Sequence, residues 1–514
     1  MYPGTVAKQT PDKPAVISFE TGEVLTYRQL DDHSAAIAAE LHSLGFRKGD
    51  VIALLSDNVI ECYPIYWAAL RSGLYITPIN RHLAVPEVAF IVDDCDAKAI
   101  FVSAALADLA TAIIELTPGV RHRFIFGGAA AKHTPYSELI ASTLPRLTDQ
   151  PRGSDMLYSS GTTGVPKGIR PTLPTIQVDE PGDPVTALMA QMFKVGADDV
   201  YLQPAPVYHA APLKWASSVQ ALGGTVVQMG KFDPEGALKA VEQYKVTIAQ
   251  FVPTMFVRML QLDDDVRTKY DMSSLRMAVH AAAPCPPEVK QAMVEWWGPV
   301  LFEYYGASEQ HGMSFISTPE WLKKPGSVGC HGLGVAHICD DEGNELPAGE
   351  VGTVYFEREI HPFAYHKDPE KTLKATHPNK QTWTTVGDLG HIDEDGYLYL
   401  ADRQAFVIIS GGVNIYPQEV ENALTLHDKI FDVAVIGVPD PEMGQRVKAV
   451  VQLKSGVEPS DAVAAEILAY ARERVAGFKV PRSVDFVAEI PRTPTGKLLK
   501  RKLTAQYESE GVSA

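Results

Sequence analysis

Hydrophobic and polar positions alternate along the N-terminal part of the chain with two periods, one helical and one extended. Helical spacing covers TYRQLDDHSAAIAAELHSLG, residues 26–45, and ends at Gly45. Short apolar runs of the strand type occupy 51–56, 74–79, 98–105, 123–128, 223–230, 246–254 and 275–283. Helical patterns over 234–244 and 286–297 lie between the later runs. This alternation predicts a layered α/β body.

The pattern changes between 326 and 400, where runs such as GTVYFER and GYLYLAD are separated by Asp, Glu and Gly turns. That is typical of a β-rich subdomain. After Arg403 the α/β pattern resumes, with helices expected over 415–427 and 465–475 and strands over 432–440 and 446–453. We therefore predict a protein of the α/β class. A large N-terminal body of layered α/β subdomains plus the β-rich subdomain, residues 1–403, precedes a small C-terminal α+β domain, residues 404–514.

Composition narrows the class of protein. Of 514 residues, 46% are hydrophobic and 21% charged, typical of a folded globular chain. A net charge of −17 argues against a nucleic-acid partner. Neither an export signal nor a membrane-spanning apolar stretch is evident, while peripheral membrane contact and a homo-oligomer stay open. The five cysteines contain no CxxC pair, which favours a reducing cytoplasmic setting over a disulfide framework or a zinc site.

The most informative segment is SSGTTGVPKG, residues 159–168, which follows the strand-like MLY. Its glycines let several backbone N–H groups converge on an anion, its hydroxyls add donors, and Lys167 adds positive charge. It is not a Walker A loop, because Pro166 stands where that motif requires glycine. Taken alone, the segment is equally compatible with a phosphate-binding loop and with a flexible surface loop.

Four further blocks follow it. EYYGASEQ, 303–310, and TTVGDLG, 384–390, each place an acid among small turn residues. Glu309 suits Mg²⁺ beside phosphates and Asp388 suits the hydroxyls of a ribose, although either acid is also compatible with a turn or a cap. The remaining blocks are DRQAFVIISGGVNIYPQEVE, 402–421, and PRTPTGKLLKRKL, 491–503.

With these five ordered blocks, the chain resembles the acyl- and aryl-CoA synthetases of the adenylate-forming superfamily, from about Thr26 to Leu503. The resemblance implies an AMP-forming acid–coenzyme A ligase. Such an enzyme uses ATP, Mg²⁺ and coenzyme A, converts a small-molecule carboxylic acid to an acyl-adenylate, and then transfers the acyl group to the thiol. The resemblance also implies that the C-terminal domain is mobile, with its hinge after Arg403.

The resemblance assigns roles to individual residues. It implies a triphosphate loop of Ser159, Ser160, Gly161, Thr162, Thr163, Gly164 and Lys167, with Thr162 and Glu309 at the metal. The adenine is expected near Ala282, Ala283, Pro284, Tyr305, Gly306, Ala307 and Ser308, and the ribose near Asp388 and Arg403. His209 would position the carboxylate, Lys497 would bridge it and the α-phosphate, and Ser410, Gly411 and Gly412 would line the thiol channel.

Each of these assignments has a plainer alternative in the residues themselves. Lys497 is compatible with a solvated basic tail, His209 with a structural histidine, and the small residues with tight core packing. The chain also departs from the common pattern of the superfamily: Ala405 and Phe406 replace charged hinge residues, and Val413 stands where many CoA ligases have glutamate.

Acceptor and acid are the least determined parts of the expected reaction. A carrier protein or oxygen could replace CoA as acceptor, and a non-catalytic nucleotide-binding protein would not need Lys497. The acyl site is expected to be mostly apolar, with the neighbourhood Val207, Tyr208, Ala210, Lys214, Trp215, Ala281 and Gly306. This composition favours a hydrophobic acid, either a medium- or long-chain fatty acid or one of steroid or aryl type.

Overall fold

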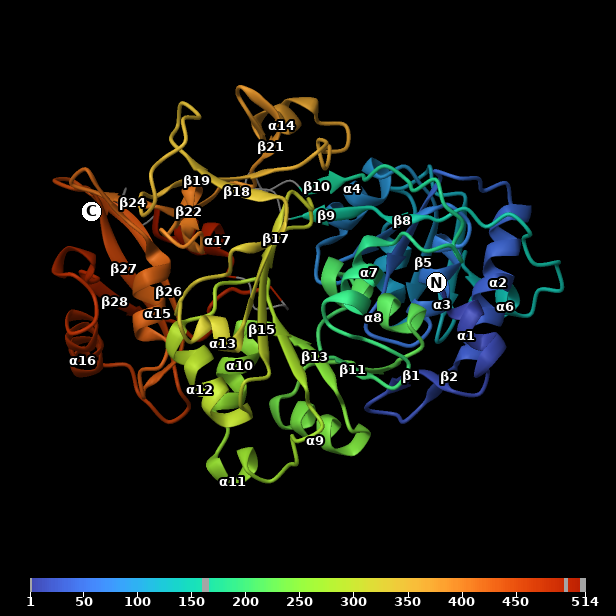
Figure 1. Ribbon diagram of the computed structural model, residues 1–514, viewed down its shortest axis with the longest axis horizontal. Helices are drawn as coiled ribbons and strands as arrows, with labels where there is room; N and C mark the ends of the chain where they lie inside the picture. Colours follow the sequence, from blue (N-terminus) through green and yellow to red (C-terminus); the bar gives the residue numbers. More distant parts are fainter. Residues whose placement is uncertain (1, 160–165, 494–497, 509–514) are drawn as a thin grey trace. The chain divides into compact units, whose positions relative to one another are not determined.

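The computed structural model describes residues 2–159, 166–493 and 498–508. Its contacts divide the chain into two compact units. The first unit contains Met1–Gln250, Asp263–Ala278 and Phe363–Thr372, and the second contains Phe251–Leu262, Val279–Pro362 and Leu373–Ala514. Both units mix helices with strands (Figure 1), so the predicted α/β class is confirmed. Among the described residues, no helix is both long and apolar enough to cross a membrane.

A parallel six-stranded sheet forms one layer of the first unit, in the order β7-β6-β5-β3-β4-β8. Its strands are β3 (Val51–Leu55), β4 (Tyr75–Ile79), β5 (Ala97–Ser103), β6 (His122–Phe126), β7 (Thr134–Pro135) and β8 (Ser154–Asp155). Every residue of β3 and β4 is buried. Their uninterrupted apolar runs are therefore those of a sheet covered on both faces.

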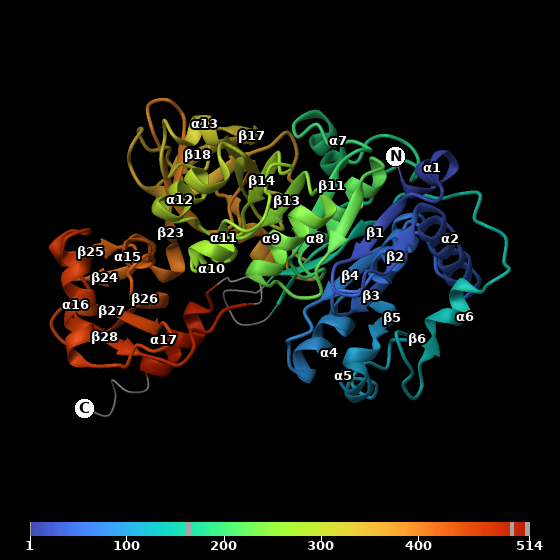
Figure 2. The same cartoon turned by 90° about the horizontal axis from the view of Figure 1, so that it is seen from below.

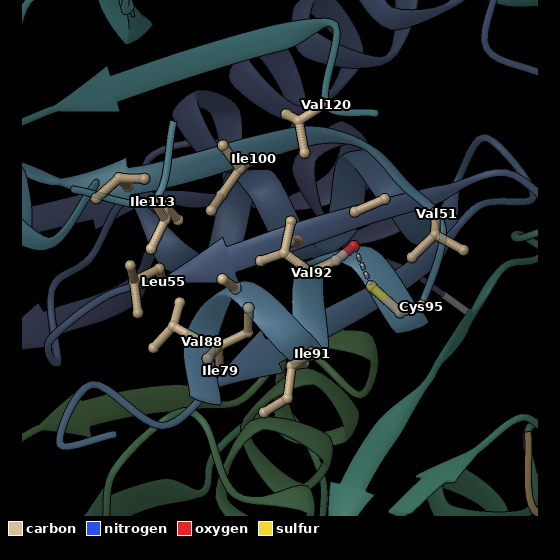
Figure 3. Close-up of a cluster of buried hydrophobic side chains, with 14 of the residues drawn as sticks. Val51, Leu55, Ile79, Val88, Ile91, Val92, Cys95, Ile100, Ile113 and Val120 are labelled. Atoms are coloured by element: carbon tan, nitrogen blue, oxygen red, sulfur yellow. Dashed lines mark hydrogen bonds between the residues drawn. The ribbon is translucent and has the colours of Figure 1, made fainter. Parts of the chain in front are cut away.

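Helices cover both faces of this sheet. Helices α4 (Val85–Asp94) and α5 (Ala107–Ala112) lie on one face, and α2 (Tyr27–Ser43) and α6 (Tyr136–Ile140) on the other (Figure 2). Figure 3 shows the core beneath α4, where Val88 and Val92 pack with Val51, Leu55 and Ile100. Alternate residues of β3 therefore face α4, as the period of two in a strand requires.

The predicted helix over 26–45 is confirmed as α2, and its start has a local cause. The Thr26 Oγ1 accepts a hydrogen bond from the Gln29 backbone N–H, and the Gln29 Oε1 accepts one from the Thr26 N–H. This capping box satisfies two of the backbone donors that the first turn of a helix leaves unpaired. Helices α1 (Pro3–Gln9) and α3 (Cys62–Leu70) complete this part of the unit.

A second, mixed sheet of the first unit has the order β13-β11-β12-β1-β2. Its strands are β1 (Pro14–Ser18), β2 (Val24–Thr26), β11 (Val200–Gln203), β12 (Thr225–Gln228) and β13 (Ile248–Phe251). Helices α7 (Pro184–Gln191), α8 (Ala210–Ala221), α9 (Pro234–Tyr244) and α11 (Asp264–Arg267) accompany it. A separate hairpin joins β9 (Leu157–Ser159) to β10 (Lys167–Ile169).

The second unit begins its regular structure around β14 (Met277–His280), within which the chain passes from one unit to the other. Antiparallel strands β15 (Leu301–Gly306), β16 (Met313–Ser317) and β17 (His331–Leu333) follow. Helices α10 (Pro253–Leu260), α12 (Pro287–Trp297) and α13 (Thr318–Trp321) belong to the same region. Strand β14 and helix α12 agree with the predicted strand over 275–283 and helix over 286–297.

The predicted β-rich region is confirmed as an antiparallel sheet in the order β20-β21-β19-β22-β23, with β18 paired to β19. Its strands are β18 (Val335–Cys339), β19 (Gly352–Glu357), β20 (Thr376–His377), β21 (Lys380–Thr384), β22 (Asp388–Ile392) and β23 (Leu398–Arg403). Helix α14 (Pro369–Lys374) precedes β20 in the chain. Val354, Phe356 and Leu398 form the core of this sheet.

After Arg403, a short 3₁₀ turn, Gln404–Phe406, leads into a sheet in the order β25-β24-β27-β26, with β28 paired to β27. Its strands are β24 (Ile408–Ser410), β25 (Val413–Ile415), β26 (Ile430–Asp440), β27 (Gly444–Leu453) and β28 (Ser483–Phe486). Val433 and Val435 pack with α15 (Pro417–Leu424) and α16 (Asp461–Arg472), and Ala434 and Ile436 pack with Leu503 of α17 (Lys500–Glu508). Successive residues of β26 thus fill two cores on opposite faces.

Candidate functional site

The glycine- and hydroxyl-rich segment begins at the end of β9 and ends in β10, two antiparallel strands of the first unit. Ser159 and Lys167 are paired in register where the two strands meet the loop. The predicted phosphate ligands between them, Ser160, Gly161, Thr162, Thr163 and Gly164, lie outside the described residues. The strands therefore bring both ends of the segment together, with Lys167 opposite Ser159 at its base.

A segment from much later in the chain contacts the base of this hairpin. Tyr365 forms a bridge with Ile169, and the His366 N–H donates to the Gly168 carbonyl oxygen at 2.8 Å. The Lys167 Nζ lies 5.0 Å from the centre of the Tyr365 ring. Sequence reasoning missed this segment, since about 200 positions separate the two partners and no local pattern marks their contact.

His209 immediately precedes α8, as its N-cap residue. Its backbone N–H donates to the Pro206 carbonyl at 3.2 Å, and its ring packs against Tyr208 at 4.6 Å. The start of α8 therefore determines where the imidazole lies, which is compatible with a positioning role and with a structural one.

Lys214, one turn farther along α8, makes an ion pair beneath the surface. Its Nζ lies 2.9 Å from the Asp155 Oδ2, and Asp155 also accepts a hydrogen bond from the Tyr66 hydroxyl at 2.5 Å. Burial lowers the pKa of Lys214, but the charge and hydrogen bond of Asp155 reverse the sign, so this pKa is raised. The ion pair of Lys214 thus joins α8 to β8, the strand that precedes β9 and the segment 159–168.

Three predicted nucleotide residues meet in the second unit. The Tyr305 hydroxyl donates to the Asp388 Oδ2 at 2.7 Å, and the Arg403 Nε lies 3.2 Å from the Asp388 Oδ1. Asp388 and Arg403 are direct partners across β22 and β23. Burial, followed by the charge of Asp388, raises the pKa of Tyr305 well above its usual value, which keeps the phenol a donor. The carboxylate is therefore oriented at both oxygens.

Glu309 lies in the loop between β15 and β16 and is only 8% exposed. The same loop contains Ala307 and Ser308 and ends at Gly312, where a Cβ would lie 2.0 Å from the Phe356 ring. The described residues contain no group of three or more metal-ligating side chains. Mg²⁺ commonly takes one or two carboxylates and completes its shell with phosphate oxygens and water, so a single carboxylate at Glu309 fits that ion.

The small residues predicted near the adenine follow β14 directly. Ala282 and Pro284 are exposed, and Ala282 has a φ of 74°, a strained value for alanine. Exposure argues against the tight core packing that composition alone allowed. Gly306 lies at the end of β15, next to Tyr305.

An ion pair that sequence reasoning did not identify lies beneath these residues. The Lys290 ammonium is fully buried and lies 2.6 Å from the Glu303 Oε2, while the His280 Nε2 lies 3.7 Å from the same oxygen. Burial and then the charge of Lys290 lower the pKa of His280 well below its usual value. This cluster joins α12 to β14 and β15, the strands that lead to the predicted adenine contacts.

Ser410, Gly411 and Gly412 form the tight turn between β24 and β25. Gly411 and Gly412 have φ values of 57° and 80°, the left-handed conformations that a two-residue hairpin turn of this kind requires. A Cβ at Gly411 would lie 2.4 Å from the Met443 Cε. Val413, which replaces the glutamate of many CoA ligases, is exposed beside this turn. Lys497 lies outside the described residues.

Two family models match the chain. The model described as AMP-binding enzyme matches residues 5–360, and the model described as AMP-binding enzyme C-terminal domain matches residues 419–497. Together they cover the segment 159–168, Tyr305, Glu309 and Lys497, whereas Asp388, Arg403 and the Ser410–Gly412 turn lie between the two matched ranges.

Curated relatives extend over nearly the whole chain. A long-chain-fatty-acid–CoA ligase of Bacillus subtilis is 30% identical and covers 97% of this chain and 92% of its own length. A fatty acid–acyl-carrier-protein ligase, ScoC of Streptomyces coeruleorubidus, is 30% identical and covers 98% of this chain and 95% of its own length. The first uses coenzyme A and the second a carrier protein, as their names state.

A solved structure has the same fold over the full chain. It is that of the anthranilate CoA ligase AuaEII in complex with anthranoyl-AMP, which superposes with a TM-score of 0.84 at 26% identity. The alignment covers 100% of this chain and 98% of that one. A protein with this fold therefore binds an aromatic acyl-adenylate.

Proposed function

The chain belongs to the AMP-binding enzyme family, and on that premise we propose that it is an AMP-forming acid–coenzyme A ligase. The observation that carries the proposal is the orientation of Asp388 by Tyr305 and Arg403. The two family models support it, because they match the N-terminal part of the chain at residues 5–360 and the C-terminal part at residues 419–497. A carboxylate held at both oxygens offers its remaining lone pairs to the hydroxyls of a ribose.

In the first half-reaction, the acid's carboxylate oxygen bonds to the α-phosphorus of ATP. The bond from this phosphorus to the bridging oxygen breaks, and pyrophosphate leaves with the electron pair. The carboxylate is itself the nucleophile, so no catalytic base is needed and the protein positions reactants and neutralises charge. We assign this to Lys167 and Lys497, with His209 orienting the carboxylate. Ser159 and the loop 160–164 would hold the phosphates.

Thr162 and Glu309 are the proposed ligands of Mg²⁺, which supplies positive charge to the phosphate oxygens when it is bound. Buried Glu309 suits this role because a carboxylate shielded from water acts strongly on a nearby cation. The adenine is proposed to lie against Ala282, Ala283, Pro284 and Gly306.

In the second half-reaction, the thiol sulfur of coenzyme A attacks the acyl carbonyl, its proton is lost to solvent, and AMP leaves. We propose that the domain 404–514 moves about a hinge after Arg403 between the two steps, so that Lys497 clears the carbonyl. The turn Ser410–Gly412 would then lie along the thiol arm. Its glycines, which carry no side chain, would let the backbone approach that arm closely.

The proposed acid is hydrophobic, either a medium- or long-chain fatty acid or one of steroid or aryl type. Both the fatty-acid ligase and the anthranilate ligase among the similar proteins act on acids of this kind, as their names state. Trp215 is stacked between Phe193 and Tyr201, so this part of the predicted acyl neighbourhood is aromatic. A cytoplasmic setting is proposed from the five unpaired cysteines.

A carrier protein is the second candidate acceptor, and the specific observation in its favour is the relative ScoC. Exposed apolar side chains beside the Ser410–Gly412 turn, at Ile409, Val413 and Met443, agree with either acceptor.

The deciding experiment offers the enzyme a panel of acids with ATP, Mg²⁺ and coenzyme A, and measures AMP release and acyl-CoA by mass spectrometry. One or more hydrophobic acids should yield both products in equal amounts. A parallel series replaces coenzyme A with an acyl-carrier protein. If adenylate accumulates without thioester for coenzyme A but is consumed by the carrier, the acceptor assignment is wrong. The absence of both acyl-adenylate and pyrophosphate release for every acid overturns the ligase itself.

A further inference from the structure

We infer that Tyr365 is a positioning residue for Lys167, and that the segment Phe363–Thr372 completes the base of the phosphate loop. The phosphate ligand rests on the proposed function, whereas the contact itself lies wholly within the first unit. None of the blocks that indicated the reaction includes this segment. Its assignment therefore adds a part that the sequence pattern left out.

Backbone contacts show how the segment joins the hairpin. The bridge from Tyr365 to Ile169 and the hydrogen bond from the His366 N–H to the Gly168 carbonyl extend along the free edge of β10. A two-stranded hairpin is marginally stable alone, and an added strand-like segment makes its register more secure. The position of Lys167, at the first residue of β10, then depends on this third segment.

Gly168 makes the close approach feasible. A Cβ there would lie 2.9 Å from the Tyr158 ring and 3.1 Å from the His366 Cβ. Any side chain would therefore displace either the β9 partner or the later segment. The glycine that ends the sequence motif thus has a packing reason in addition to the flexibility that its composition indicates.

The Tyr365 ring gives Lys167 a defined position without cancelling its charge. The Nζ lies 5.0 Å from the ring centre, within the range of a cation–π contact. Tyr365 is 7% exposed, and its ring packs edge-on against the Phe363 ring at a centroid distance of 5.2 Å. The Tyr365 backbone N–H donates a hydrogen bond to the Thr372 Oγ1 at 2.9 Å. A rigid aromatic face of this kind orients the ammonium, and the ring carries no negative charge that would neutralise it.

Neighbouring lysines differ in their contacts. Lys167, Lys367 and Lys371 line one hollow of about 140 Å³ beside the hairpin. Lys367 is paired with Asp96 at 2.9 Å and Lys371 with Asp368 at 2.7 Å, so carboxylates balance both charges. Lys167 has in addition the aromatic contact with Tyr365, which the other two lysines are not seen to make.

Measuring the two half-reactions separately distinguishes a role of Tyr365 in positioning Lys167 from general structural support. The β- and γ-phosphates are present while the adenylate forms, and in its reversal by pyrophosphate, but they are gone when the thiol attacks. Loss of the Tyr365 ring should therefore weaken ATP and pyrophosphate use. It should leave thioester formation from supplied acyl-adenylate unchanged.

The test compares Tyr365→Leu, which removes the aromatic face, with Tyr365→Phe, which keeps it. Phe363→Leu is the matched control, because it removes a neighbouring ring and keeps the Tyr365 ring. In Tyr365→Leu we expect the KM for ATP to rise about five- to thirtyfold, the range of one cation–π contact, with the KM for the acid unchanged. Tyr365→Phe and Phe363→Leu should stay within about twofold of wild type.

A second measurement does not need turnover. Calorimetry with pyrophosphate and Mg²⁺ should give a weaker Kd for Tyr365→Leu and for Lys167→Met, and the double variant should be no weaker than Lys167→Met alone. Additive losses, an unchanged pyrophosphate Kd, or equal damage to both half-reactions would overturn the role of Tyr365. A wild-type enzyme that binds pyrophosphate but activates no acid would contradict the proposed ligase and leave this inference standing.

Discussion

Asp388 is the residue whose surroundings say most about the chemistry. Its carboxylate is held by a phenol on one oxygen and a guanidinium on the other. Both partners come from neighbouring strands or strand ends, so their geometry is set before a nucleotide arrives. Pre-organisation of this kind reduces the entropy that binding would otherwise cost.

Lys497 allows the most direct test of the proposed mechanism at the scale of one residue. Lys497→Ala should lower adenylate formation about 100- to 1000-fold, because a positioned cation stabilises charge that develops at the α-phosphate. Thioester formation from supplied acyl-adenylate should stay near the wild-type rate. Both rates can be measured separately, by pyrophosphate release and by acyl-CoA production.

Lys502→Ala is the control for Lys497, since Lys502 is an exposed cation of the same basic run. It should leave both half-reactions unchanged. If Lys497→Ala slows the two steps equally, or if Lys502→Ala reproduces its effect, the bridging role of Lys497 is wrong and the basic run acts only through its overall charge.

His280 predicts a pH dependence of stability. The folded protein keeps its ring neutral because burial, and then the charge of Lys290, lower its pKa well below the usual 6.5. The unfolded chain takes up the proton near that value, so the stability due to neutral His280 is present above about pH 6.5 and is lost as pH falls. His280→Phe should therefore reduce the decline in unfolding free energy between pH 6.5 and 5.

Urea unfolding at a series of pH values measures this difference. Phenylalanine keeps the edge-on packing against Phe256, which lies 5.3 Å from the His280 ring. Replacement of the exposed His42 by Phe should retain the wild-type pH dependence. A His280→Phe variant with an undiminished acid decline would mean that other groups cause it.

At the scale of elements, the ion pair between Lys214 and Asp155 joins a helix to a strand. Helix α8 carries His209 at its start, and β8 leads toward the phosphate loop. A buried pair costs desolvation energy, so it contributes little net stability, but removal of one partner leaves an uncompensated charge. The pair therefore makes the position of α8 depend on that of β8.

Lys214→Met should lower the unfolding free energy by about 3–5 kcal/mol, the cost of a buried unpaired carboxylate. The double variant Lys214→Met/Asp155→Asn should recover most of this loss, because the amide stays a neutral acceptor for the Tyr66 hydroxyl. Lys239→Met on α9 is the control, with a change under about 0.5 kcal/mol at an exposed site. Equal stability of the single and double variants would contradict the account.

At the scale of the whole molecule, the proposed site residues come from different parts of the chain. Lys167 and His209 lie in the first unit, and Tyr305, Glu309, Asp388 and Arg403 in the second. Ser410–Gly412 and Lys497 belong to the proposed mobile domain. A reaction in two steps suits such a division, because the acid and the thiol need different groups at one carbonyl.

The proposed hinge can be tested at Ala405, within the 3₁₀ turn Gln404–Phe406. Ala405→Pro restricts the backbone and should lower complete acyl-CoA formation about tenfold or more, while one isolated half-reaction keeps most of its rate. Ala405→Ser is the control and should be nearly neutral. If proline slows both isolated steps as much as the complete reaction, the pivot lies elsewhere.

The sequence by itself determined the elements and the class of chemistry. Helix α2 follows from a period of 3.6 in its apolar positions, and strands β3, β4 and β26 follow from short apolar runs. The ordered blocks around Lys167, Glu309, Asp388 and Ser410 indicated adenylation through their resemblance to the acyl- and aryl-CoA synthetases.

Only the tertiary structure decided which distant residues act on one another. The contact of Tyr365 with Lys167 and the pair of Lys290 with Glu303 leave no periodic trace, since a side-chain contact depends on spatial proximity and not on spacing along the chain. The same holds for the ion pair between Asp155 and Lys214, a residue of the predicted acyl neighbourhood. The period of apolar positions can be seen in the sequence, whereas the partners of charged and aromatic side chains depend on how the chain folds.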